Sequence, residues 1–105
     1  MNLFKISDKI VFNTLKNIKF GYLEITNHSG ELFKFGNPRD PLKANLDIKK
    51  SNFTFNLIKG GSVGLAESYM RNEFETKNLS DLIEVTARNI KQIHKFSGLL
   101  DLPFI

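Results

Sequence analysis

The 105 residues are 41% hydrophobic and 25% charged, a balance that predicts one folded domain and argues against disordered or low-complexity structure. The absence of cysteine excludes disulfides, thiolate metal sites and a cysteine nucleophile, and is compatible with the cytoplasm. Fifteen Lys and Arg against eleven Asp and Glu give a net charge of +4, which would favour an anionic partner, but a solvated surface explains this modest excess better.

The first predicted elements are a helix and a hairpin. Between residues 3 and 18, apolar residues recur at steps of three and four, which is typical of an amphipathic helix. Residues 22–26 alternate as a half-buried strand does, and residues 31–36 form the returning strand after a turn at 27–30. Two prolines within residues 37–41 then predict a loop.

The second half of the chain predicts one strand followed by helices. Strict alternation over residues 43–49 indicates a strand, and Ser51 is expected to cap a helix that ends at Gly60 and Gly61. Ser62 starts a short helix, and Asn78 caps a longer one. The buried stripe of that longer helix is predicted to be Leu82, Ile83, Val85, Thr86, Ile90 and Ile93.

This order of elements predicts an α+β fold. A small antiparallel sheet, the hairpin plus a further strand, packs with an amino-terminal helix and two or three carboxyl-terminal helices. The apolar segment 99–105 docks on this core, contacts a partner or marks a cut between domains. No signal peptide or membrane-spanning segment is expected, so the predicted location is cytoplasmic.

Few residues suggest chemistry. Gly60, Gly61 and Gly64 lie between helical segments, where turn geometry explains them better than phosphate binding. His28 and His94 lack partners at metal-ligand spacing, so we expect no metal site, and no nucleophile and base pair is evident.

The best site candidate is the segment around Glu67 and Tyr69, where a carboxylate lies beside an amphipathic ring; its alternative is a Glu that caps backbone amides beside a packed Tyr. The phenylalanines could line a groove for acyl chains, although ordinary core packing explains them better. Nucleic-acid binding would need stacking rings exposed on one sheet face, and we expect none.

Several segments together carry a resemblance to a family. They are the hairpin over residues 21–36, the strand 44–48 before Phe53, the block Gly61-Ser62-Val63-Gly64-Leu65-Ala66-Glu67-Ser68-Tyr69-Met70, and residues 78–89. With these, the chain from about Leu15 to Asn89 resembles the amino-terminal, non-catalytic domain of cyclopropane-fatty-acyl-phospholipid synthases, which are S-adenosylmethionine-dependent methyltransferases. The family often has an Asp-Gly pair where this chain has Arg71-Asn72.

The resemblance implies an accessory domain, residues 1–105, that presents a phospholipid acyl chain and has no catalytic residue of its own. S-adenosylmethionine would bind the missing catalytic domain, encoded in cis or in trans. An anionic membrane surface on the inner face and a homo-oligomer are further partners that this reading allows. The alternative is a structural docking module that binds protein and no lipid. Candidate contacts with lipid or partner are Leu65, Glu67, Tyr69, Met70 and Phe74.

Overall fold

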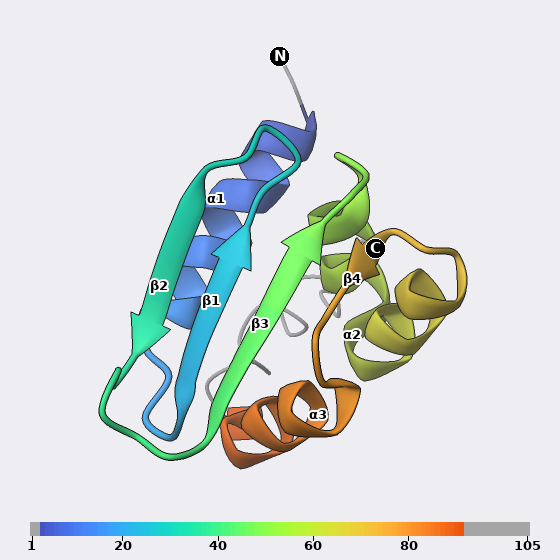
Figure 1. The fold of residues 1–105 in the computed structure, drawn as a ribbon. Helices are drawn as coiled ribbons and strands as arrows, with labels where there is room; N and C mark the ends of the chain where they lie inside the picture. The colour runs from blue at the N-terminus through green and yellow to red at the C-terminus, as the bar shows by residue number, and fades with distance from the viewer. Residues whose placement is uncertain (1–2, 92–105) are drawn as a thin grey trace.

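The computed structural model describes residues 3–91. Figure 1 shows helix α1 followed by three strands, a long bent helix, a short strand and a last helix. In chain order these are α1 (Leu3–Leu15), β1 (Tyr22–Thr26), β2 (Leu32–Gly36), β3 (Lys43–Ile48), α2 (Phe53–Met70), β4 (Phe74–Glu75) and α3 (Leu79–Arg88).

The four strands form one mixed sheet in the order β2-β1-β3-β4. β1 pairs with β2 in an antiparallel hairpin in which Glu24 lies opposite Lys34. β1 also pairs with β3, but in parallel, and β3 pairs with β4 in antiparallel fashion. β2 carries the chain back to the end of the sheet where β1 begins, and residues 37–42 pass from β2 to β3 at that same end, so that β3 runs parallel to β1.

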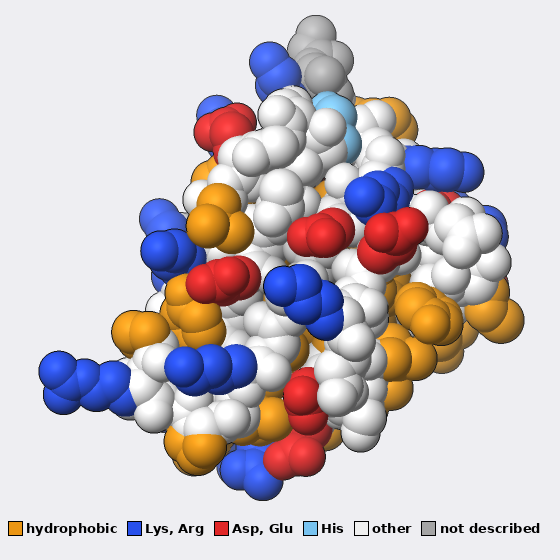
Figure 2. All heavy atoms as spheres, viewed as in Figure 1, with side chains coloured by type: hydrophobic (Ala, Val, Ile, Leu, Met, Phe, Trp, Pro, Cys, Tyr) orange, Lys and Arg blue, Asp and Glu red, His pale blue; other side chains and the backbone are white. Residues whose placement is uncertain are grey.

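The helices leave one face of the sheet open. In Figure 1, α1 lies behind β1 and β2, α2 lies behind and beside β3, and α3 crosses the end of the sheet where β1 and β3 begin. Apolar side chains of alternate strand positions meet the helices to form the core, among them Leu23, Ile25, Leu46 and Ile48. Figure 2 shows charged side chains of both signs over the open face, as expected for a solvated sheet surface.

The α+β class, the hairpin, the amino-terminal helix and the carboxyl-terminal helices are confirmed. The expectation of a wholly antiparallel sheet is wrong at one pair, β1 with β3. The first helix ends at Leu15, earlier than expected, and the residue that caps α2 is Asn52, which makes no side-chain hydrogen bond, rather than Ser51. The predicted cap at Asn78 is confirmed, since its side chain accepts a hydrogen bond from the Asp81 amide.

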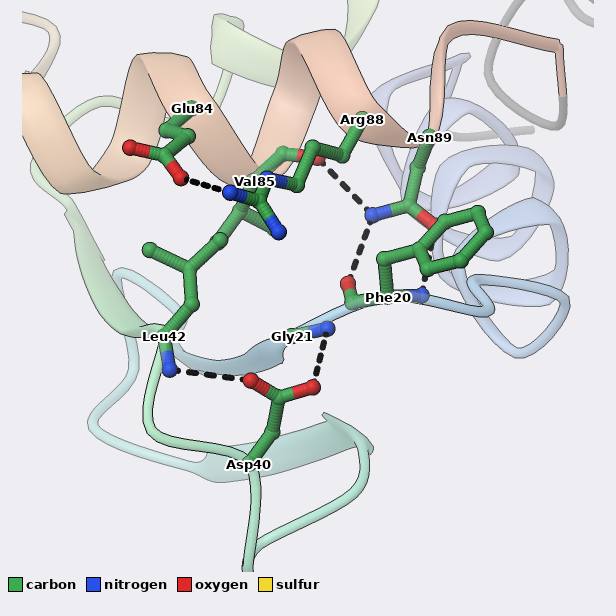
Figure 3. A network of polar contacts seen from close by, with 8 residues as sticks. All are labelled: Phe20, Gly21, Asp40, Leu42, Glu84, Val85, Arg88 and Asn89. Carbon is green, nitrogen blue, oxygen red and sulfur yellow. Dashed lines mark hydrogen bonds and ion pairs between the residues drawn. The ribbon is translucent and has the colours of Figure 1, made fainter.

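Asn89 ties the end of α3 to the chain before β1 (Figure 3). Its side-chain oxygen accepts hydrogen bonds from the amides of Lys19 and Phe20, at 2.8 and 3.0 Å. Its side-chain nitrogen donates to the carbonyls of Phe20 and Val85, at 2.7 and 2.8 Å. Because the side chain is fully buried and all its hydrogen-bonding directions are used, it fixes the position of α3 against the sheet.

Asp40 fixes the return from β2 to β3 in a similar way (Figure 3). Its carboxylate accepts hydrogen bonds from the amides of Leu42 and Gly21, at 2.9 and 3.0 Å. These two hydrogen bonds, with a smaller contribution from the positive charge of Arg88, hold the pKa of Asp40 below its usual value despite some desolvation. The ionised carboxylate of Asp40 therefore stabilises the folded state.

We expect the stability of the protein to fall as the pH drops below about 4, because Asp40 then takes up a proton more readily in the unfolded chain. Asp40→Asn should unfold more easily than the wild type at neutral pH, and this difference should shrink as the pH falls through the folded-state pKa. Urea unfolding at a series of pH values measures it. Asp47→Asn is the control, because the Asp47 side chain makes no hydrogen bond or ion pair within residues 3–91.

Candidate functional site

Helix α2 bends sharply at Gly61, which has φ 57° and ψ −133°. This backbone conformation is almost exclusive to glycine, so the predicted interruption of the helix is confirmed at that residue. Gly64 lies at the close approach created by the bend: a Cβ there would lie 2.5 Å from the Asn56 carbonyl oxygen. Gly60, the third glycine of the predicted turn, is helical and has open space around it, so the bend does not depend on it.

The second half of α2 and helix α3 enclose an apolar groove of about 670 Å³. From α2 it is lined by Ser62, Leu65, Ala66, Tyr69 and Met70. From α3 come Leu79, Ile83, Thr86 and Ala87, and Ile90 lies just after the end of this helix. Phe74 of β4 completes the lining, and none of the lining residues within 3–91 is charged. Figure 2 shows hydrophobic side chains gathered at the edge of the molecule where Figure 1 places the end of α2 and α3.

Four of the five candidate contact residues come together in this groove. Phe74 is 1% exposed and packs with its ring centroid 5.6 Å from that of Tyr69, which is partly exposed. Leu65 is half-buried and Met70 is largely exposed beside them. Glu67 is exposed and does not line the groove, so the structure separates it from the other four residues.

The contribution of α3 to the groove differs from the sequence prediction. Leu82 and Val85 are buried in the core, as expected. Ile83 is 53% exposed and Ile90 is also exposed, although both were expected in the buried stripe. The apolar side chains of α3 extend further around the helix than the face that packs on the core within residues 3–91. The apolar side chains that remain uncovered line the groove. Ile93, the remaining member of the predicted stripe, lies outside the described residues.

The carboxylate of Glu73 fixes the backbone next to Phe74, which lines the groove. It is buried and accepts hydrogen bonds from Asn56 and Arg71, each at 3.0 Å. The Glu73 carbonyl oxygen accepts the amides of Lys49 and Lys50 at the end of β3. Burial raises the pKa of Glu73, but three neighbours lower it by more, so that the pKa lies below its usual value. These neighbours are the Asn56 amide, the Ser68 hydroxyl and the Arg71 guanidinium. The Ser68 hydroxyl lies near the carboxylate without the geometry of a hydrogen bond.

The turn after α2 is made by Asn72 and not by a glycine. Asn72 adopts φ 58°, the left-handed conformation that glycine takes most readily and asparagine tolerates. The chain therefore reverses after Met70 and places Phe74 beneath Tyr69.

Within residues 3–91, no group of three or more His, Asp or Glu side chains could hold a metal ion. His28 lies exposed in the turn between β1 and β2, while His94 falls outside the described residues. No helix in the described part of the chain is long and apolar enough to cross a membrane.

Comparison with known proteins adds no relative. No family model matches the chain, no curated protein matches it, and no solved structure is similar to it. The groove between α2 and α3 is therefore the feature from which a function has to be argued.

Proposed function

We propose that the chain is an accessory domain that holds a phospholipid acyl chain in the groove between α2 and α3 for a cyclopropane-synthase-like methyltransferase. The observation that carries the proposal is the groove itself, an open apolar surface to which the described part of the chain contributes no charged residue. Soluble proteins bury most such surface or use it to bind an apolar ligand or partner. The resemblance in sequence supports the methyltransferase as the partner.

The groove suits a flexible hydrocarbon chain in its shape and chemistry. It runs along α3 from Leu79 to Ala87, about 12 Å of helix, and continues to Ile90 just beyond the end of the helix. Each methylene group that moves from water into such a surface contributes about 0.8 kcal/mol. The Tyr69 ring is a partly exposed flat apolar surface, and the Met70 side chain is unbranched and flexible. Both can therefore contact an acyl chain in more than one position.

In the reaction, this domain would bind and orient the phospholipid acyl chain. When bound to its own domain, S-adenosylmethionine would supply the methyl group. The glycines of this chain do not fit that cofactor, because residues 60–64 lie within α2 instead of between a strand and a helix. The groove would exclude water from the acyl chain and fix its position, which raises the rate of a transfer catalysed elsewhere.

The acyl-chain site is tested with Ile83→Lys, and Val63→Lys is the matched control. Both isoleucine and valine are exposed, at 53% and 67%, but only Ile83 lines the groove. Because about half of Ile83 is exposed, an acyl chain that covers it gains about 1 kcal/mol, and loss of this contact should weaken binding of myristate about fivefold. Titration calorimetry below the critical micelle concentration measures this affinity. Equal affinities in the two variants, or no binding by the wild type, would refute the acyl-chain site.

The accessory role requires a second experiment. The chain is co-purified with a matching catalytic domain, and methyl transfer from labelled S-adenosylmethionine to phospholipid is measured with and without it. Transfer should depend on the chain and should fall with Tyr69→Ala, provided circular dichroism shows that this variant is folded. A catalytic domain that forms no complex with the chain, or works equally well without it, rules out this role.

The alternative function is a structural docking module, in which the same groove receives a helix of a partner protein. The exposed Ile83 and Ile90 favour it as well, since an apolar helix face can bind the face of another helix. The two functions differ in one result. A docking module forms the complex but binds no myristate, and its complex is lost in Ile83→Lys.

A further inference from the structure

The groove between α2 and α3 has uncovered apolar side chains on both of its walls. Ile83 of α3 is 53% exposed, and Tyr69 and Met70 of α2 are 43% and 72% exposed. The described part of the chain contributes no charged residue to the lining. Folded domains rarely leave a contiguous apolar surface of this kind in contact with water, so we expect the groove to have an occupant even in the absence of a ligand.

The residues that follow the described part of the chain start at this groove. Ile90 lines the groove just after the end of α3, and residues 92–105 begin two positions later. An extended chain spans about 3.3 Å per residue, so the seven residues 92–98 can reach about 23 Å. The wall that α3 contributes is only about 12 Å long. The segment 99–105 is therefore within reach of the whole groove.

The segment 99–105 matches the groove in its chemistry. Five of its seven residues are Leu, Phe or Ile, and Asp101 is its only charged residue. Apolar side chains gain free energy when they leave water for a surface lined by other apolar side chains. The segment and the groove can therefore cover each other's apolar surface.

The covalent connection favours this segment over a separate partner. A segment that is joined to its site by a short linker acts at an effective concentration on the order of 1 mM. A separate ligand must reach a similar concentration, or bind more tightly, to displace it. A contact that is too weak to hold a separate peptide can therefore keep the groove of the same chain occupied.

We propose that the segment 99–105 docks in the groove between α2 and α3 of its own chain and competes with any other occupant of that groove. The proposal goes beyond the proposed function and does not rest on it, because it needs only the groove and the sequence of the chain. It adds regulation to the site, since an acyl chain or a partner helix binds only after the segment has left. If about nine molecules in ten hold the docked segment, the affinity for such a ligand is about tenfold lower.

The test uses single cysteines, because the chain has none of its own. Ala87→Cys places a thiol on the groove wall, and Val63→Cys places one on an exposed part of α2 that does not line the groove. Each is made in the full chain, once with the unaltered segment and once together with Leu99→Asp and Leu100→Asp, which introduce charges into the segment. The rate of reaction with N-ethylmaleimide measures how accessible each thiol is.

We expect the two aspartates to raise the rate at Ala87→Cys about tenfold and to leave the rate at Val63→Cys within about twofold. Equal rates at Ala87→Cys with and without the aspartates would overturn the proposal. An equal acceleration at both cysteines would also overturn it, because general loosening of the fold would then explain the result. So would a rate at Ala87→Cys, with the unaltered segment, that falls as the protein concentration rises, because the segment would then dock on a second copy.

This experiment contains no lipid, so it can fail while the acyl-chain site holds, and the acyl-chain site can fail while the docked segment holds. Where both hold, Leu99→Asp with Leu100→Asp should bind myristate about tenfold more tightly than the wild type in a calorimetric titration. An unchanged affinity for myristate would overturn the competition between the segment and the acyl chain.

Discussion

Replacing Asn89 with alanine is expected to lower the free energy of unfolding by about 3 to 5 kcal/mol. The change removes four hydrogen bonds and leaves the amides of Lys19 and Phe20 and the carbonyls of Phe20 and Val85 without this partner. A buried polar group without a partner costs about 1 to 3 kcal/mol, and water that enters the new cavity recovers part of the total. Urea unfolding followed by circular dichroism measures the difference.

The control is Asn13→Ala, because Asn13 is an exposed residue of α1 whose side chain makes no hydrogen bond within the described part of the chain. Its stability should stay within about 0.5 kcal/mol of the wild type. Hydrogen exchange gives a local readout: in Asn89→Ala, the amides of Lys19 and Phe20 should exchange faster than those of β1. An unfolding midpoint equal to that of the wild type would mean that Asn89 does not hold α3 on the sheet.

Local patterns predicted most of the elements, and long-range pairing accounts for most of the errors. The strand Tyr22–Thr26, the helix break at Gly61 and the start of α3 at Asn78 each depend on residues close together in sequence. The parallel pairing of β1 with β3 does not, because alternation of apolar residues fixes which face is buried but not the direction of the neighbour. Strand β4 has two residues, too few for any periodicity.

The candidate site was predicted on one wall only. The α2 wall, with Leu65 and Tyr69, follows from the sequence block that carries the family resemblance. The α3 wall was assigned to the core, because periodicity shows that Ile83 and Ile90 share an apolar side of the helix but does not show what covers it. Asn89 was missed for a related reason, since its partners Lys19 and Phe20 are about seventy residues away.

Gly64→Ala is expected to destabilise the protein by about 2 to 4 kcal/mol and to weaken myristate binding as well. The new Cβ would lie 2.5 Å from the Asn56 carbonyl oxygen, and backbone atoms on both sides of the bend must move apart to admit it. Gly64 lies between Ser62 and Leu65, which line the groove, so the shift moves that wall. Urea unfolding and calorimetric titration of the same variant measure the two effects.

The opposite effect on stability is expected for Gly60→Ala, which therefore serves as the control. Gly60 is helical with nothing within 4 Å of its Cβ position, so alanine should stabilise α2 by up to about 1 kcal/mol and leave binding unchanged. Opposite signs at two glycines four residues apart would show that the bend depends on close backbone contact at Gly64. Equal effects of the two substitutions would instead mean that Gly64 does not lie against the Asn56 carbonyl. The second half of α2, which forms one wall of the groove, would then have a different position.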